Sequence, residues 1–282
     1  MNFGHIKRKI PDVVLTLAAI LIIIAILFPV YWIVSSSLRP YGTLYTTTFQ
    51  IIPKGATLDA FHWVLFESNF LFWMRNSLIV LFLTNLICLL VVCPSAYAFS
   101  RFKFFGKGGL LYSFFVLTQV MGGLSIIGLI GLYFLLSHLG MLNSLIVLSF
   151  IYAASMVPFC TWFLKTYYDS LPRDLDESAL VDGASFLQTL RHVILPIAKP
   201  GIFTIIIFTS IAVWSEWVIA GIILSPENYT VPIGLVGLMG TWETPWNRFA
   251  AMAIFYAIPM VILFMVSQRF LKQGLTLGAV KG

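Results

Sequence analysis

Six long stretches of apolar residues, with hardly a charge among them, constrain this sequence more than any other feature. They cover residues 13–37, 77–99, 109–131, 145–166, 200–223 and 249–270. The hydrocarbon core of a bilayer is about 30 Å thick, and a helix needs about 20 apolar residues to cross it. Charged residues make up only 10% of the chain, against about 25% in a soluble domain. The sequence therefore predicts an all-α integral membrane protein with six transmembrane helices.

The distribution of Lys and Arg predicts the orientation of these helices. Thirteen of the 17 basic residues lie on one side of the predicted membrane, in the two termini and in the loops that follow the second and fourth stretches. The other side has four, namely Arg39, Lys54, Arg75 and Arg248. Loops rich in Lys and Arg stay in the cytoplasm. We therefore predict a multi-pass protein of the cell membrane (plasma or inner membrane) with both termini in the cytoplasm.

The predicted cytoplasmic loop at 167–199 has the sequence signals of a helix that ends at a glycine. Asp174 and Glu177 have the spacing of an acidic capping box, so a helix can begin there. Its first turn is negatively charged, which the helix dipole favours. Gly183 then ends this helix, because glycine adopts the left-handed conformation without steric cost.

A second helix is predicted directly after this glycine. Ser185 and Gln188 have the spacing of another capping box, and the helix runs toward Arg191 until Pro196 and Pro200 end it. Periodicity leaves two roles open for the pair. The two helices could lie on the membrane surface as amphipathic helices, or they could fill a groove in a soluble partner.

The residue string of this loop resembles the cytoplasmic motif of importer permeases in the ATP-binding cassette superfamily. That motif runs Glu-Ala-Ala, three residues, Gly, nine residues, Ile, one residue, Leu-Pro. The chain keeps every spacing of the motif with Glu177, Ser178, Ala179, Gly183, Val193, Leu195 and Pro196. Ser178 replaces the first alanine of the motif, and Val193 replaces the isoleucine. Together with Asp174 and Asp182, these are the residues that the resemblance implies for coupling to an ATPase.

The resemblance extends over nearly the whole chain and implies a type I importer permease fold. Residues 1–70 would hold the cytoplasmic N-terminus, the first transmembrane helix and part of the first external loop. Residues 71–267 would form the shared transmembrane domain of five helices, with the coupling motif at 177–196. Residues 268–282 would form a cytoplasmic tail. The end of this tail, at 274–282, is similar to that of maltose-type permeases, which implies a di- or oligosaccharide of the maltose, maltodextrin or trehalose class.

The same resemblance implies the partners of the chain. They are a second homologous permease in a heterodimer, two copies of a cytoplasmic ATPase, and an extracytoplasmic sugar-binding protein. ATP and Mg²⁺ would be bound by the ATPase, and this chain would hold no cofactor. The sequence agrees, because Gly106-Lys107-Gly108 lacks the spacing and the hydroxyl residue of a P-loop. The implied role of the chain is to couple closure of the ATPase to alternating access of the sugar pathway.

Glu216 is the only acidic residue inside a predicted transmembrane stretch, and Trp214 and Trp217 lie close to it. A carboxylate at this depth costs about 2.5–3.5 kcal/mol on insertion scales, and such groups usually face a cavity or a partner. Glu216 and the two tryptophans could therefore contact a sugar hydroxyl or form a gate in the pathway. The alternatives are an interhelical hydrogen bond from Glu216 and, third, a role in proton coupling.

Two other functional classes compete with the importer permease. An ion-coupled secondary transporter, which acts without an ATPase, would carry several intramembrane charges, often in repeated halves. A membrane-embedded enzyme would bring polar catalytic groups together, yet the four histidines are scattered and have no metal-ligand spacing. Neither class has a use for the long acidic loop. The sequence therefore favours a transport subunit over an enzyme.

Overall fold

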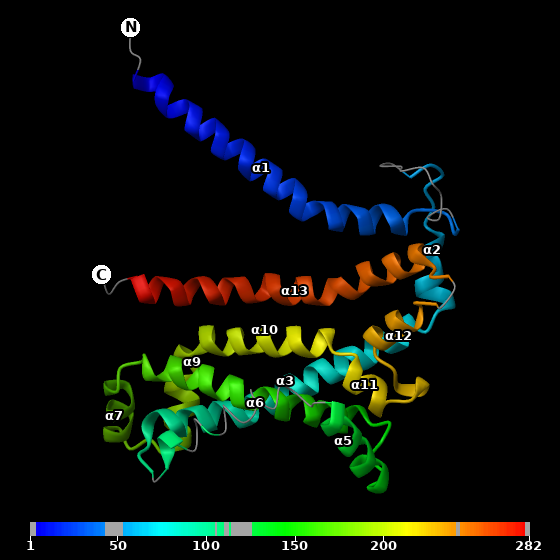
Figure 1. Cartoon of the computed structure of the whole chain (residues 1–282). Coiled ribbons are helices and arrows are strands. Elements are labelled where there is room, and N and C mark those ends of the chain that lie inside the picture. Colours follow the sequence, from blue (N-terminus) through cyan, green and yellow to red (C-terminus); the bar gives the residue numbers. More distant parts are fainter. Residues whose placement is uncertain are drawn as a thin grey trace. The chain divides into compact units, whose positions relative to one another are not determined.

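The structure is a computed structural model that describes residues 4–42, 53–104, 106–109, 113, 126–240 and 243–279. Helices dominate these ranges, and no strand occurs in them (Figure 1). The chain divides into two compact units, one made of Met1–Phe70 with Leu235–Ala257 and the other of Leu71–Gly234 with Ile258–Gly282. The predicted all-helical class is confirmed.

The helices are divided between the two units. The first unit contains α1 (Gly4–Ser37), α2 (Asp59–His62), a π-helical turn (Trp63–Glu67) and the first part of α13 (Trp246–Ala279). The second unit contains α3 (Phe70–Arg101), α5 (Ile126–His138), α6 (Leu145–Asp169), α7 (Asp174–Val181), α8 (Phe186–Thr189), a π-helical turn (Leu190–Ile194), α9 (Leu195–Ile197), α10 (Lys199–Ser215), α11 (Val218–Ile223), a 3-10 turn (Pro226–Asn228) and the rest of α13. The boundary between the units falls inside α12 (Val231–Gly237), after Gly234.

Aromatic side chains join α2 and the following π-helical turn to the first part of α13 in the first unit. Phe255 of α13 packs against Phe61 and Phe70, with ring centroids 5.6 and 5.8 Å apart. The Arg248 guanidinium lies 4.4 Å from the ring centroid of Trp63, a cation–π contact. The side chains of α1 from Val14 onward are largely exposed, so this apolar helix offers its sides to lipid or to another chain.

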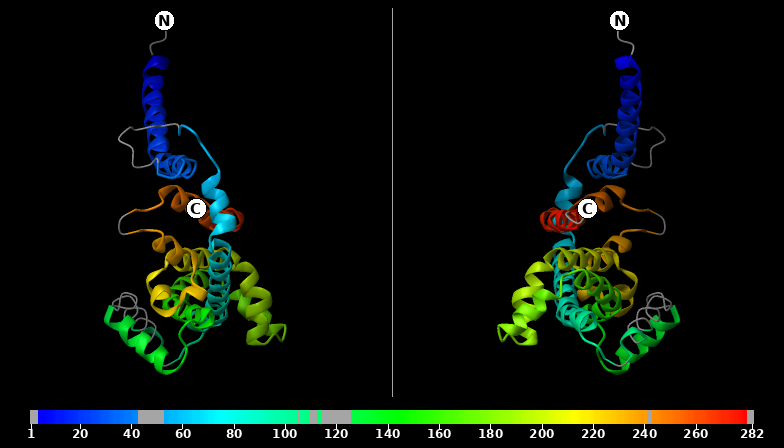
Figure 2. Two further views of the ribbon diagram at one scale, coloured as in Figure 1. Left: turned by 90° about the vertical axis from the view of Figure 1, so that its right-hand side faces the viewer. Right: turned by 90° about the vertical axis from the view of Figure 1, so that its left-hand side faces the viewer.

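Two apolar cores are formed by the described residues of the second unit. One gathers buried side chains of α3, α6 and α10 around Cys88, Cys160 and Ile205, and it continues into the π-helical turn at Leu190 and Ile194. The other core joins α3, α5 and α6 to α10 and α11. Phe203 of α10 also stacks on Phe270 of α13, with ring centroids 3.8 Å apart. Figure 2 shows the yellow-green segment between α6 and α10 projecting to one side of the other helices of this unit.

Among the described residues, the helices long and apolar enough to cross a membrane are α1, α3, α6 and α13, and the bent pair Phe186–Ile197 with Lys199–Ser215 would be a fifth span if it is counted as one. The helices α1, α3, α6 and α13 correspond to the first, second, fourth and sixth predicted stretches. Of the third stretch, the structure describes mainly the part in α5 (Ile126–His138); residues 110–112 and 114–125 lie outside the described ranges. The number of six spans and the orientation of the termini stay predictions.

The fifth predicted stretch differs from the expectation of one continuous helix. α10 ends at Ser215, and α11 begins only at Val218. Glu216 between them has an extended backbone, with φ −80° and ψ 125°. At its other end α10 meets the helical segment Phe186–Ile197 at a bend of 80°. The apolar composition fixed the extent of this stretch but not the break inside it.

Candidate functional site

The first helix of the predicted coupling loop begins where the sequence indicated, but without the expected cap. α7 starts at Asp174, and Arg173 is its N-cap residue with no side-chain hydrogen bond to the helix. The capping box of Asp174 and Glu177 is therefore wrong. Asp174 lies inside the first turn, together with Asp176 and Glu177. Its negative charge stabilises the helix through the interaction with the helix dipole and not as a cap.

Gly183 ends α7 as predicted. Its φ is +80°, and it follows the C-cap residue Asp182. The Gly183 amide donates to the Leu180 carbonyl at 3.0 Å, and the Ala184 amide donates to the Ala179 carbonyl at 2.9 Å. This pair of bonds is a Schellman motif. A Cβ added to Gly183 would meet no atom within 4 Å, so the need for glycine comes from the backbone conformation and not from crowding.

The second helix begins with the predicted capping box. The Ser185 amide donates to Oε1 of Gln188 at 2.7 Å. The helix continues further than expected, because Pro196 lies inside α9 instead of ending the segment. A π-helical turn comes before α9, and in it the Leu195 amide donates to the Leu190 carbonyl. A new helical turn begins at Leu195. Pro196 then occupies a first helical turn, where its missing N–H is not needed.

The motif residues separate into a surface and an anchor. The exposed ones are Asp174, Glu177, Ser178, Asp182, Gly183 and Pro196. Ala179 is buried, and Val193 and Leu195 are half-buried and pack against the core around Cys88 and Cys160. Val181 on the exposed side is 88% accessible. The helix pair thus offers an acidic surface with an exposed apolar residue, while its other side is fixed to the second unit.

The fixed side contains a residue that the sequence did not single out. Asp176 accepts a hydrogen bond from the Tyr97 hydroxyl, and its Oδ2 lies 2.8 Å from Nε of Arg101. Both partners belong to the last part of α3. Two local features of the sequence point to these residues. Tyr97 and Arg101 are four residues apart, and Asp176 lies three residues before Ala179, which is buried. Nothing in the sequence connects α3 to α7 across about 75 residues.

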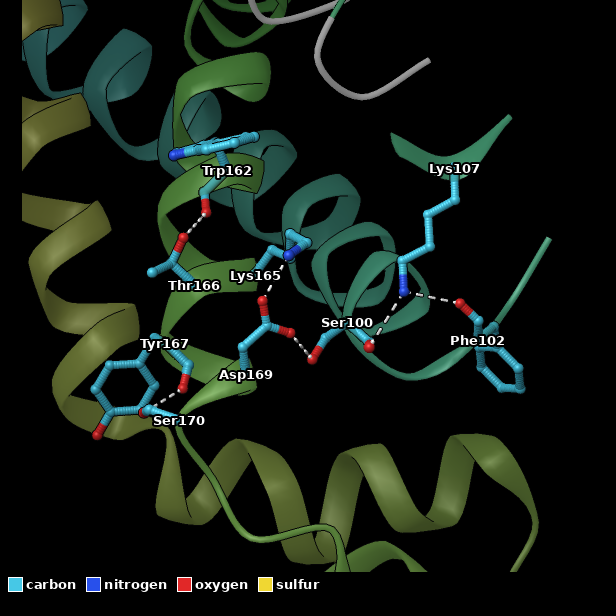
Figure 3. A network of polar contacts seen from close by, with 9 residues as sticks. All are labelled: Ser100, Phe102, Lys107, Trp162, Lys165, Thr166, Tyr167, Asp169 and Ser170. Atoms are coloured by element: carbon cyan, nitrogen blue, oxygen red, sulfur yellow. Dashed lines mark hydrogen bonds and ion pairs between the residues drawn. The ribbon is translucent and has the colours of Figure 1, made fainter. Parts of the chain in front are cut away.

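A second polar network joins α3 to α6 nearby (Figure 3). Oδ1 of Asp169 accepts from the Ser100 hydroxyl at 2.7 Å, and Oδ2 pairs with Nζ of Lys165 at 2.5 Å. Nζ of Lys107 donates to the Phe102 carbonyl at 2.9 Å. These contacts join the end of α3 to α6, and none of them involves α7.

Glu216 lies at the break between α10 and α11. One carboxylate oxygen accepts from the Tyr152 hydroxyl, and the backbone amides of Ile219 and Ala220 donate to the carboxylate at 2.8 and 3.3 Å. The interhelical hydrogen bond considered from the sequence is therefore present. The two tryptophans differ from each other, because Trp214 is buried at 7% exposure and Trp217 is 47% exposed.

Residues 13–277 match the family described as binding-protein-dependent transport system inner membrane component. The chain belongs to this permease family. Members of this family are transport components and not enzymes. The chain is therefore a multi-pass inner membrane permease. This finding rules out the hypotheses of a secondary transporter and of a membrane-embedded enzyme.

Individual relatives of this permease cover nearly its full length. It is 36% identical over 265 residues to the galactooligosaccharides transport system permease protein GanQ of Bacillus subtilis (strain 168), with 92% of each chain covered. It is 34% identical over 284 residues to the trehalose/maltose transport system permease protein MalG of Thermococcus litoralis, with 98% of this chain and 99% of the relative covered.

A solved structure has the same fold. A chain of a bacterial ABC transporter involved in the import of the acidic polysaccharide alginate matches this permease with a TM-score of 0.80. The match covers 95% of this chain and 99% of the other, at 20% sequence identity. The resemblance inferred from the loop motif is thus confirmed at the level of family and fold.

Proposed function

We propose that this permease is one half of the translocation pathway of an ATP-driven importer for a di- or oligosaccharide of the maltose, maltodextrin or trehalose class. A second homologous permease would supply the other half, and an extracytoplasmic protein would deliver the sugar. Two copies of an ATPase would bind ATP and Mg²⁺ on the cytoplasmic side. This chain would hold no cofactor of its own.

The observation that carries the proposal is the exposed surface of the glycine-linked helix pair. Three carboxylates, those of Asp174, Glu177 and Asp182, lie on it with the apolar Val181. A short helix that exposes an apolar residue among acids suits a groove with a basic rim and an apolar floor. An isolated amphipathic pair on anionic lipid would place basic residues there instead. The surface therefore supports docking to a soluble ATPase.

The substrate class is supported by the relatives. They include permeases named for the transport of galactooligosaccharides, trehalose/maltose and maltodextrin, all of them carbohydrates. The similarity of residues 274–282 to the end of maltose-type permeases narrows this range to the maltose, maltodextrin and trehalose class.

The test is to purify the tagged chain from its native membrane in mild detergent and to identify the bound proteins by mass. We expect a second permease and an ATPase in about twofold excess over each permease. The assembled complex, reconstituted with its binding protein, should import maltose, maltotriose or trehalose at the expense of ATP. A lone chain, or a homo-oligomer that transports sugar without any ATPase, would refute the proposal.

A further inference from the structure

Little of α7 is held by apolar packing. Its buried residues are Asp176 and Ala179 alone, while Leu180 and Val181 are exposed. A helix of eight residues is too short to persist without tertiary contacts. The contacts of Asp176 are therefore the polar link between α7 and α3, beside the packing of α7 against α8 and the following π-helical turn.

Asp176 is held by two side chains of α3. The Tyr97 hydroxyl donates to its Oδ1, and the Arg101 guanidinium forms an ion pair with its Oδ2 at 2.8 Å. The side chains of Arg101 and Asp176 are only 9% and 12% exposed. A pair so removed from water is screened little by salt, and removing one partner leaves the other as a buried, uncompensated charge.

The ion pair also joins two helix ends of opposite polarity. Arg101 is the last residue of α3, and Asp176 lies in the first turn of α7. A cation at a helix C-terminus and an anion at a helix N-terminus are both stabilised by the helix dipoles. The same guanidinium donates to the Leu171 carbonyl at 3.2 Å, so Arg101 holds both the connection that leads into α7 and α7 itself.

The second helix of the pair is fixed to the same end of α3. The Phe186 ring lies 4.9 Å from the ring centroid of Tyr97 and 5.1 Å from that of Phe102. Tyr97 thus contacts both helices, one through its hydroxyl and the other through its ring. Neither helix of the pair can shift without straining contacts to this end of α3.

The other end of α3 is hydrogen-bonded to another segment. Asn76 is fully buried, and its Nδ2 donates to the Tyr229 carbonyl at 3.1 Å. The Ser77 hydroxyl accepts from the Val231 amide at 2.9 Å. From Asn76 to Arg101, α3 runs for 26 residues (101 − 76 + 1), which corresponds to about 39 Å at 1.5 Å per residue. One helix therefore connects the helix pair to the segment at 229–231.

We propose that Tyr97, Arg101 and Asp176 form a clamp that transmits movement of the helix pair to α3, and through α3 to the segment at 229–231. This role rests on the proposed function, since the movement would come from the ATPase. The three are positioning residues. With the clamp intact, displacement of the helix pair moves α3. With the clamp broken, α7 can move without α3, and only the ring contacts of Phe186 in the second helix still join the pair to this end of α3.

The experiment measures sugar imported per ATP hydrolysed by the complete transporter in liposomes. For Asp176→Asn and Arg101→Met we expect the ATPase to co-purify and ATP hydrolysis to persist, while the ratio falls by about tenfold or more. Tyr97→Phe keeps the ring contact with Phe186 and loses only the hydroxyl, so we expect a fall of about threefold. Arg101→Lys, which restores the charge, should recover part of the ratio.

Asp169→Asn is the matched control. It weakens an acid–base network at the same end of α3, with Ser100 and Lys165, that does not touch α7. Its ratio should equal that of the unaltered chain. ATP-driven uptake by the unaltered chain tests the proposed function itself, and its absence would overturn both proposals. The clamp would be overturned if Tyr97→Phe imported as much sugar per ATP hydrolysed as the unaltered chain, and if Asp176→Asn did so as well where it assembles. The proposed function would not be affected by that result.

Discussion

Glu216 illustrates how a single acid can be accommodated in an apolar segment. Its carboxylate meets the first free amides of α11, at Ile219 and Ala220, and the hydroxyl of Tyr152. The amides at a helix N-terminus have no partner within the helix, and a negative charge there is favoured by the dipole. The side chain thus compensates the break that its own extended backbone creates.

We expect Glu216→Ala to destabilise the assembled permease by about 1–2 kcal/mol, because it removes the half-buried carboxylate that accepts from the first amides of α11 and so acts as its cap. Glu216→Gln keeps an acceptor and should reduce uptake only modestly, with ATP hydrolysis still stimulated. The measurements are the thermal unfolding midpoint and sugar uptake. The exposed Glu227 provides the control, since Glu227→Ala should change neither. Complete loss of uptake by Glu216→Gln in a normally assembled complex would instead make Glu216 a residue of the sugar pathway.

At the scale of elements, the glycine-linked pair depends on one backbone conformation. Gly183 has φ +80° and closes the Schellman motif of α7. A residue with a side chain costs about 1–2 kcal/mol in this region, and proline cannot adopt it. The angle between the two helices is therefore encoded by the absence of a Cβ.

Gly183→Ala should lower the amount of ATPase bound per permease, and Gly183→Pro should abolish ATPase binding and uptake while membrane insertion stays normal. The readout is the ATPase retained after purification of the tagged chain, together with uptake. Gly140 is a matched control, because it also has a positive φ, of +65°, and an added Cβ there would also meet no atom within 4 Å. Gly140→Ala should keep ATPase binding. Normal uptake by Gly183→Pro would refute the assignment of the helix pair to coupling.

At the scale of the whole molecule, topology follows from where charge is allowed. The helices α1, α3, α6 and α13 are apolar enough to cross the membrane. Most Lys and Arg residues lie in the termini and loops that are predicted on one side of the membrane. Since basic loops are retained in the cytoplasm, the helix pair is expected to face the ATPase side. The exposed residues Lys54 and Lys103 are predicted on opposite sides of the membrane.

Cysteine labelling tests this topology. A membrane-impermeant maleimide should react with Lys54→Cys in intact spheroplasts and with Lys103→Cys only after permeabilisation. The native Cys88, Cys93 and Cys160 are buried and should give little background. The reverse pattern of labelling would invert the predicted orientation, and with it the side on which the helix pair meets a partner.

The sequence by itself determined the features that depend on local composition. A transmembrane helix must satisfy its own backbone and expose apolar side chains, so the stretches of α1, α3, α6 and α13 could be recognised one at a time. The stop at Gly183 and the capping box of Ser185 and Gln188 were equally local, since each involves residues within a few positions of one another.

Only the tertiary structure decided what depends on helices meeting. In the sequence, Asp176 does not differ from the other acidic residues in the first turn of α7. Its contacts with Tyr97 and Arg101 of α3 are visible only in the tertiary structure. The break at Glu216 likewise needs Tyr152 from α6. These contacts have no period or spacing in the sequence, because they are fixed by which helix faces come together. A buried charge is stable only where such a partner is supplied.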